Sequence, residues 1–133
     1  MNLKVGDTAA RSKTFTNEDV RAFAELTGDH NPVHLDDEYT AGTRFGRRVA
    51  HGMLAASLIS ATLANDLPGR GTVYLGQQLQ FTAPVFPGDE VTARVTVTKV
   101  RDDKPVVTLD TVCTNQRGET VIKGEAVVML TAA

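Results

Sequence analysis

Residues 52–65 present no polar face, and this feature constrains the fold more than any other in the sequence. A helix that is apolar on every side must be covered by other structure, because it cannot lie on a surface exposed to water. We therefore predict a buried helix over residues 52–65, ended by the turn-forming residues 67–71. Its apolar residues are Met53, Leu54, Ala55, Ala56, Leu58, Ile59, Ala61, Leu63 and Ala64.

The second half of the chain can supply this cover as a β-sheet. Apolar residues alternate with others along residues 91–97 and 107–113, which is the period of half-buried strands. The connections between the last three runs contain Pro, Gly and Asp and are too short for crossover helices, so we predict an antiparallel meander. The four strand-like runs are residues 72–82, 89–101, 106–115 and 119–130.

A buried helix followed by such a sheet predicts the α+β class, with the sheet wrapped around the helix. The 133 residues suffice for one domain, spanning residues 1–133. Lys and Arg number 14 against 16 Asp and Glu, so no basic face indicates nucleic acid or an anionic membrane. We expect a soluble, cytoplasmic protein, because no run has the length of a signal peptide or a membrane span. The single cysteine, Cys113, fits a reducing compartment, and its strand-like setting favours a core position over a nucleophile.

An earlier helix is predicted over residues 16–28. Thr16 and Asp19 form a capping-box-like pair, and Gly28 is suited to the left-handed residue that ends a helix. Asp29 therefore follows directly after a helix end. Pro32 lacks a backbone N–H and disfavours helix in the residue before it, so we expect residues 29–34 to be a fixed, non-helical loop.

Asp29 and His34 lie five residues apart on this loop, where their side chains can converge. A histidine and a carboxylate together can activate water near neutral pH. The pattern is equally typical of an Asx-turn Asp and a surface His in an ordinary Asn-Pro loop. Spacing alone does not choose between these interpretations.

Gly52 stands at the start of the buried helix. Helix N-termini carry unpaired N–H groups and partial positive charge, so this end can meet a developing oxyanion, and a glycine allows close approach. A glycine needed only for packing fits equally well. Ser57 and Ser60 either bond back to the preceding helical turn or face a pocket, and the first is favoured.

A metal site is the competing use of Asp29, His30, His34 and His51. Pro32 excludes two histidines on one helix face, and no cysteine joins the group, so we expect no metal.

Four stretches resemble one family, the R-specific enoyl-CoA hydratases of the MaoC-like (hydratase 2) branch of the hot-dog superfamily. Residues 28–34 read G-D-H-N-P-V-H and are similar to its G-D-x-N-P-x-H loop. Residues 50–60, 74–77 and 84–91 resemble the matching stretches of the short hydratases that feed polyhydroxyalkanoate synthesis. The resemblance covers about residues 3–130.

The resemblance implies a hot-dog fold and reversible hydration of trans-2-enoyl-CoA to (R)-3-hydroxyacyl-CoA, without a cofactor. It implies an acyl-CoA substrate and a homodimer with the active site near the subunit interface. It assigns the roles of seven residues: Asp29 and His34 as the catalytic pair, Gly52 in the oxyanion hole, Asn31 and Ser60 as pocket support, and Leu63 and Val128 lining the acyl pocket.

Three alternatives share this scaffold. Hot-dog thioesterases often place a carboxylate on the central helix, but this helix has no Asp or Glu before Asp66. A non-catalytic subunit would be expected to lose the loop residues that are present here. A dehydratase acting on an acyl-carrier-protein substrate stays open. Arg44, Arg47 and Arg48 either meet CoA phosphates or form a solvated basic turn.

Overall fold

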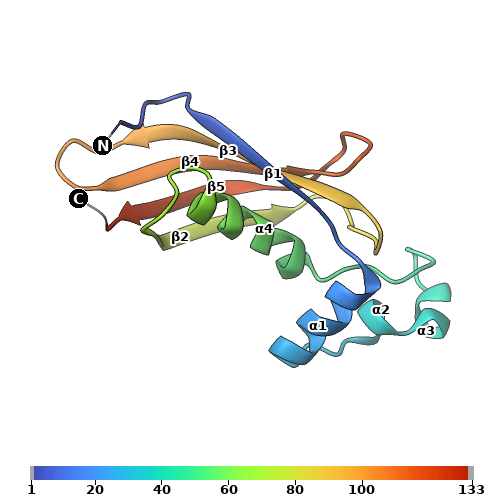
Figure 1. Ribbon diagram of the computed structural model, residues 1–133. Coiled ribbons are helices and arrows are strands. Elements are labelled where there is room, and N and C mark those ends of the chain that lie inside the picture. The colour runs from blue at the N-terminus through green and yellow to red at the C-terminus, as the bar shows by residue number, and fades with distance from the viewer. Residues whose placement is uncertain (1, 132–133) are drawn as a thin grey trace.

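The structure is a computed structural model, and it describes residues 2–131. The described chain forms four helices and five strands (Figure 1). In chain order these are β1 (Thr8–Thr14), α1 (Asn17–Thr27), α2 (Pro32–Leu35), α3 (Asp37–Ala41), α4 (Gly52–Asn65), β2 (Thr72–Phe81), β3 (Glu90–Val100), β4 (Val106–Thr114) and β5 (Thr120–Leu130). The four predicted strands and the two long helices are confirmed to within one or two residues at each end.

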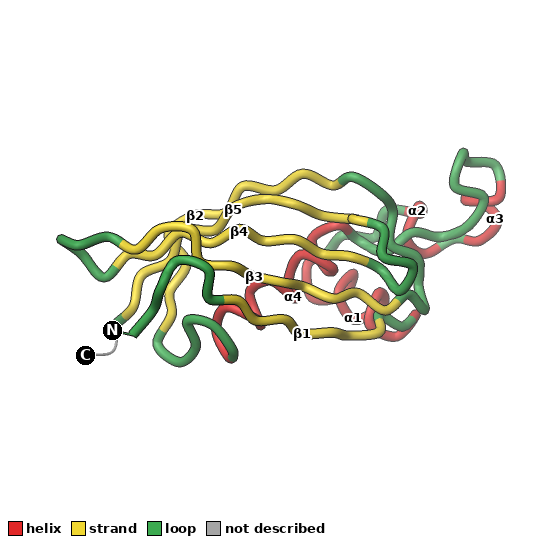
Figure 2. Tube along the Cα trace, turned by 90° about the horizontal axis from the view of Figure 1, so that it is seen from above, coloured by secondary structure: helices red, strands yellow, loops and turns green. Residues whose placement is uncertain are grey.

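The strands form one antiparallel sheet in the order β1-β3-β4-β5-β2 (Figure 2). β3, β4 and β5 form the predicted meander, but the prediction is wrong for β2, which pairs with β5 at the far edge. The connection to β3 contains Pro84 and Pro87, which cannot donate ladder hydrogen bonds. Within this connection, Val85 O accepts instead from Ala50 N at 2.7 Å.

The other side of β3 is taken by β1, a strand that the sequence did not predict. Its side chains are nearly all exposed, and only Ala9 is half-buried. An edge strand with so little burial has no alternation of apolar and polar residues from which to recognise it. β1 therefore forms one edge of the sheet, and β2 forms the other.

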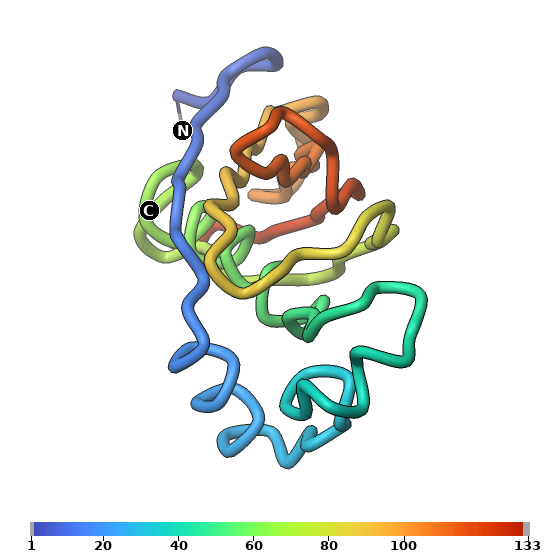
Figure 3. Tube along the Cα trace, turned by 90° about the vertical axis from the view of Figure 1, so that its right-hand side faces the viewer, coloured from blue at the N-terminus to red at the C-terminus, as the bar shows by residue number. Residues whose placement is uncertain are grey.

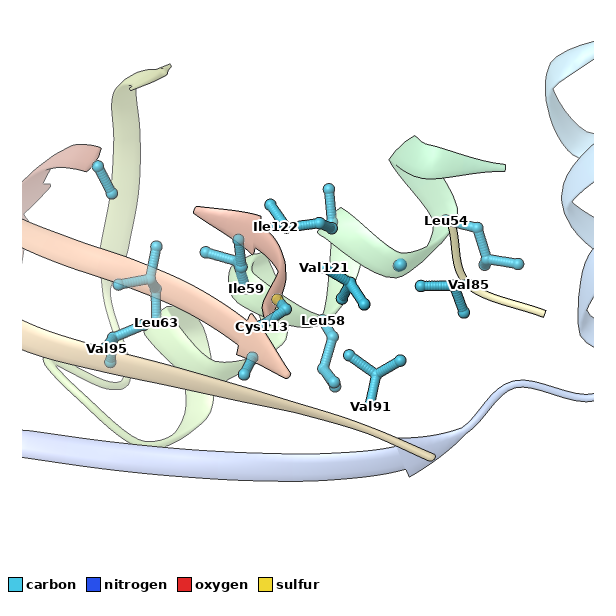
Figure 4. Close-up of a cluster of buried hydrophobic side chains, with 14 of the residues drawn as sticks. Leu54, Leu58, Ile59, Leu63, Val85, Val91, Val95, Cys113, Val121 and Ile122 are labelled. Carbon is cyan, nitrogen blue, oxygen red and sulfur yellow. The ribbon is translucent and has the colours of Figure 1, made fainter. Parts of the chain in front are cut away.

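α4 lies along one face of the sheet and supplies the centre of the core (Figures 1 and 4). Leu58, Ile59 and Leu63 pack against strand residues such as Val91 and Val95, all of them buried. The α+β hot-dog arrangement is therefore confirmed. The core position of Cys113 is confirmed too: its thiol is fully buried, and this burial raises its pKa to about 12.

The prediction that α4 is covered on every side is wrong for the single chain. Met53 is 58% exposed, and Ser57, Ser60 and Ala64 on the same side of the helix are exposed as well. These positions follow a spacing of three to four residues and therefore form one stripe along α4. The stripe lies away from the core that the sheet covers.

α1 and the segment that carries α2 and α3 gather at one end of the molecule, below the sheet and beside the start of α4 (Figures 1 and 3). This arrangement brings residues 29–34 close to Gly52. None of the helices within residues 2–131 is long and apolar enough to cross a bilayer.

Candidate active site

α1 ends at the position that its sequence predicts. Thr16 caps the helix start in a capping box with Asp19, and Gly28 follows the last turn with a φ of 81°. This left-handed conformation is easy for glycine and strained for other residues, and it turns the chain sharply. Gly28 N donates to Ala24 O at 2.8 Å, so Asp29 leaves the helix in a defined direction.

The expected non-helical loop is wrong at its second half, because Pro32–Leu35 forms one helical turn, α2. Pro32 occupies the first helical turn, where its missing N–H costs nothing and its fixed φ suits a helix. Asn31 caps this turn by accepting from Val33 N at 3.2 Å. His34 is thus carried by a short capped helix.

His34 is half-buried, and its ring has a defined protonation pattern. Its Nδ1 lies 2.7 Å from Val49 O, and a carbonyl oxygen only accepts, so Nδ1 carries the proton. Val49 N donates back to Val33 O at 3.1 Å, which ties α2 to the segment before α4. This tautomer places the lone pair of the ring on Nε2, as a general base requires.

Asp29 makes the Asx turn that its position before Asn-Pro suggested. Its Oδ1 accepts from Asn31 N at 3.3 Å, and its own N–H donates to Thr27 Oγ1 at 3.2 Å. Its Oδ2 has no hydrogen-bond partner among residues 2–131. The Asx turn therefore fixes the carboxylate and leaves one oxygen for chemistry.

His51 contacts both Asp29 and His34 and directly precedes Gly52. It precedes α4 as its N-cap residue, is 2% exposed, and donates from Nε2 to Asp29 O at 3.1 Å. Its ring stacks on the His34 ring, with centroids 3.9 Å apart and planes 29° apart. Burial lowers the pKa of His51, so the ring is neutral at physiological pH.

Gly52 begins α4, and no side chain caps this helix end. Leu54 N and Ala55 N donate to His51 O, at 3.1 and 3.3 Å, whereas the N–H groups of Gly52 and Met53 have no partner among residues 2–131 and are available to an anion. The ring of Phe81 lies over Gly52: a Cβ at this position would be 2.8 Å from Phe81 Cε1. Glycine is therefore required for packing as well, and both interpretations of Gly52 are compatible with the structure.

A cavity of about 530 Å³ connects these groups. Asp29, His34 and Gly52 all line it, and the remaining walls are largely apolar. Aromatic side chains come from α1 (Phe23), from the segment before α4 (Phe45) and from β2 (Phe81). A pocket with apolar walls and a few convergent polar groups is typical of a small-molecule site.

The other predicted residues lie outside this cavity. Asn31 is exposed and acts through the α2 cap. Ser60 is exposed on α4, two turns after Gly52, whereas Ser57 bonds back to Leu54 O at 2.5 Å, as favoured. Leu63 and Val128 are 2% and 0% exposed and belong to the core of the single chain.

The three arginines before α4 have different surroundings. Arg44 is exposed and lines the cavity. Arg47 lies over the ring of Phe86, with its Cζ 3.9 Å from the ring centroid. Arg48 donates from Nε to Asp37 Oδ1 at 2.7 Å. Within residues 2–131, Arg44 is the arginine of this turn that faces the cavity without an acidic partner.

Asp29, His34 and His51 could together hold a metal ion, because each offers a ligand atom and these atoms lie within 4.8 Å of one another. The fourth candidate, His30, is turned to Glu25 Oε1, 2.9 Å away. His51 is a poor ligand as it stands, because its Nε2 proton is held by Asp29 O and its Nδ1 is buried. This geometry favours acid–base chemistry over metal binding.

The sequence matches the MaoC-like domain family over residues 4–118. The chain belongs to this family. Among its relatives is an (R)-specific enoyl-CoA hydratase of Aeromonas caviae, 53% identical over 97% of this chain and 96% of the relative. Another, from Rhodospirillum rubrum, carries the same name and is 47% identical over 98% and 90% of the two chains.

A solved structure has the same architecture as this MaoC-like domain. It is an (R)-hydratase from A. caviae involved in PHA biosynthesis, with a TM-score of 0.94 and 53% identity over 97% of this chain and 98% of that one. The shared fold extends over nearly the whole of both chains, so each element that carries Asp29, His34 and Gly52 has a counterpart in that structure.

Sequence reasoning about this MaoC-like domain missed the site role of His51 and the aromatic walls. The sequence gives His51 as a metal candidate and as part of the 50–60 stretch, but it assigns the residue no contact with Asp29 or His34, which are 22 and 17 positions away. Phe81 was assigned to a strand without regard to which face it occupies. A period-two count along β2 could have placed Phe81 on one face with Gln77 and Leu79.

Proposed function

We propose that this chain catalyses the reversible hydration of a trans-2-enoyl-CoA to an (R)-3-hydroxyacyl-CoA. One observation carries the proposal: Asp29, His34 and the uncapped start of α4 line a single, largely apolar cavity. The names of the relatives from A. caviae and R. rubrum support the substrate and the R configuration.

In the hydration direction, a water molecule binds between the Asp29 carboxylate and His34 Nε2. A carboxylate oxygen of Asp29 and a ring nitrogen of His34 lie within 4.8 Å of one another, a separation that a single water can bridge. As the water oxygen forms a bond to C3, its proton passes to the pair, and the pair delivers a proton to C2. The overall reaction adds H and OH across the double bond and leaves both residues unchanged.

The attack places negative charge on the thioester oxygen, and the N–H of Gly52 meets this charge. The amide is fixed before the reaction starts, so no reorganisation is needed when the charge appears. Removing one such donor costs about 2.7–4 kcal/mol of transition-state stabilisation in other enzymes. The apolar walls of the cavity strengthen the interaction by excluding water.

The direct test is an assay with crotonyl-CoA. We expect loss of the enoyl-thioester absorbance and formation of 3-hydroxybutyryl-CoA, with the product oxidised by an R-specific and not by an S-specific dehydrogenase. The control is release of free thiol from the same substrate, followed with a thiol reagent. Thiol release without hydration would establish the thioesterase alternative, and the absence of both reactions would favour a non-catalytic subunit.

The position of acidic groups argues against the thioesterase alternative. Asp66, the first carboxylate after the start of α4, stands at the opposite end of that helix as its C-cap. It is paired with Arg11 at 2.8 Å. Among residues 2–131, the carboxylate that lines the cavity is therefore Asp29 of the 29–34 segment, which suits addition of water to C3.

Arg44 is placed to contact the phosphates of a CoA carrier, because it is exposed at the cavity and has no acidic partner within residues 2–131. We expect Arg44→Ala to raise KM for crotonyl-CoA by about tenfold, the effect of one charge-assisted hydrogen bond, with kcat unchanged. Crotonyl-pantetheine, which lacks the nucleotide, should show no difference between the variant and the wild type.

The matched control for Arg44 is Arg94→Ala, which removes an exposed arginine from β3. It should leave both KM values unchanged. Equal KM values for crotonyl-CoA in the wild type and in Arg44→Ala would contradict the assignment. A carrier-protein thioester used more efficiently than crotonyl-CoA would identify the acyl-carrier-protein alternative.

The active unit is a homodimer joined through β2. This edge strand is ten residues long and carries exposed apolar side chains, with Val73, Leu75 and Phe81 each between 45% and 54% exposed. Such an edge is a template for pairing with a second strand, and two-fold symmetry would place β2 against its own copy. The exposed stripe on α4, which includes Met53, lies next to the cavity and would then approach the interface.

Light scattering coupled to gel filtration should give about twice the 14.3 kDa of one chain. We expect Leu75→Lys on β2 to shift the mass to that of one chain, because the interface would bury an unpaired charge. Leu26→Lys replaces an 83% exposed leucine on α1 and should leave the mass unchanged. A fully active wild-type monomer would contradict the dimer.

A further inference from the structure

The proposed chemistry uses neither nitrogen of His51, yet this ring is the most enclosed polar group of the site. It is 2% exposed and lies between two other rings. Phe23 of α1 contacts one side, with centroids 4.9 Å apart, and His34 stacks on the ring at 3.9 Å. A buried imidazole needs an explanation, because polar groups rarely leave water without a partner for each polar atom.

The hydrogen bonds of His51 are satisfied at only one nitrogen. Nε2 must carry the proton, because Asp29 O can only accept. Nδ1 is then an unprotonated acceptor, and no donor among residues 2–131 reaches it. The protein therefore bears the cost of a buried, unpaired acceptor at this position. A phenylalanine would fill similar space without that cost but could not hold Asp29 O.

His51 touches all three parts of the site at once. Its Nε2–H fixes the backbone of Asp29, its ring face fixes the plane of the His34 imidazole, and its peptide bond leads directly to Gly52. Asp29 and His34 belong to a segment that is otherwise anchored at Val49, whereas Gly52 belongs to α4. A single rigid ring thus joins the acid–base segment to the start of the helix.

We propose that His51 is a positioning residue that sets the Asp29 carboxylate and the His34 imidazole relative to the Gly52 amide. The inference rests on the proposed hydration. The groups that face His51 from neighbouring elements are Phe23, which does not titrate, and Asp29 and His34 themselves. A neutral ring suits this place, because a charged ring would repel the His34 imidazolium that forms when water gives up its proton.

Three variants separate the two contacts of His51. His51→Gln keeps an N–H donor for Asp29 O, His51→Phe keeps a stacking ring, and His51→Leu removes both. We expect the Leu variant to lose about 10- to 100-fold in kcat, with KM changed less than threefold, because displacing reacting groups by about 1 Å has effects of this size. The Gln and Phe variants should each recover part of the loss.

His30→Gln is the matched control, since His30 lies in the same loop but is exposed and paired with Glu25. It should keep wild-type kcat. A second readout does not depend on activity: nitrogen NMR of the His34 ring should show one tautomer, protonated at Nδ1, in the wild type and a mixture of tautomers in His51→Leu.

The outcomes are distinct. The positioning role is wrong if folded His51→Leu keeps kcat within threefold of wild type and an unchanged His34 spectrum. If His51→Leu does not fold, the same result in both His51→Gln and His51→Phe excludes the role. If the wild type does not hydrate crotonyl-CoA, the proposed function fails, and the His34 spectra alone decide whether His51 orients that ring. Loss of kcat with a mixed tautomer population, recovered in part by Gln or Phe, supports the proposal.

Discussion

Replacing Asp29 by Asn is expected to lower kcat for hydration of crotonyl-CoA by about 10²- to 10⁴-fold, the usual contribution of a general acid–base group. The amide has nearly the shape of the carboxylate, and its oxygen can still accept from Asn31 N, the bond that closes the Asx turn at 3.3 Å. The fold of residues 29–34 should therefore persist. What disappears is the group that can take and return a proton.

His34→Ala should have an effect of the same size for a different reason. It removes the lone pair on Nε2, which the bond from Nδ1 to Val49 O makes available in the wild type. If the two residues act on one water molecule, the double variant should be little worse than either single variant, because residues that work as a unit give non-additive losses. The measurement is the steady-state rate of crotonyl-CoA hydration by the two single variants and the double variant.

The control for both is again His30→Gln, which changes a neighbouring side chain that points to Glu25 instead of the cavity. Thermal unfolding of each variant checks that the fold is kept. Activity within threefold of wild type in folded Asp29→Asn or folded His34→Ala would exclude the acid–base assignment.

Gly124→Ala adds one methyl group to the sheet, and we expect it to lower the free energy of unfolding strongly. A Cβ at Gly124 would overlap the carbonyl oxygen of Gln78 and lie 2.8 Å from its carbonyl carbon. These are backbone atoms of the paired strand β2 and cannot rotate away, so β2 must move from β5. Overpacking typically costs about 1–3 kcal/mol, and we expect a loss of about 3 kcal/mol here because the overlap is with backbone atoms.

Thermal denaturation should show the effect as a fall in Tm of roughly 10 °C for a domain of this size. The matched control lies outside the sheet and outside the proposed dimer interface. Gly42→Ala adds a methyl group at the end of α3, where φ is −90° and the nearest atom, Tyr39 O, would be 3.7 Å away, so it should change stability by about 0.5 kcal/mol at most. Equal Tm values for the two variants would contradict the packing of β2 on β5.

Local signals in the sequence predicted most of the elements correctly. The capping box of Thr16 and Asp19 and the left-handed Gly28 fixed both ends of α1, because helix ends depend on a few neighbouring residues. The alternation along residues 91–97 and 107–113 placed β3 and β4. Asp29, His34 and Gly52 were named in advance, although the residues alone left each with a second interpretation.

Two of the errors arise because the deciding contacts are distant in sequence. β2 pairs with β5 while β1 pairs with β3, and β1 itself has no pattern that reveals it. The error at Pro32–Leu35 is local instead: Asn31 caps this turn and Pro32 stands in its first turn, where proline favours a helix. His51 acquires its importance from rings that the fold brings to within 5 Å of it.

The narrow stretch of chain that supplies the polar groups of the cavity has a consequence for evolution and for engineering. Asp29, His34, His51 and Gly52 all come from 24 consecutive positions, while much of the apolar lining comes from residues 81–85, at the end of β2 and just after it. Part of the apolar lining can therefore be varied without touching any of these four positions. Libraries confined to residues 81–85 should change which acyl groups enter the cavity and leave the proposed catalytic residues as they are.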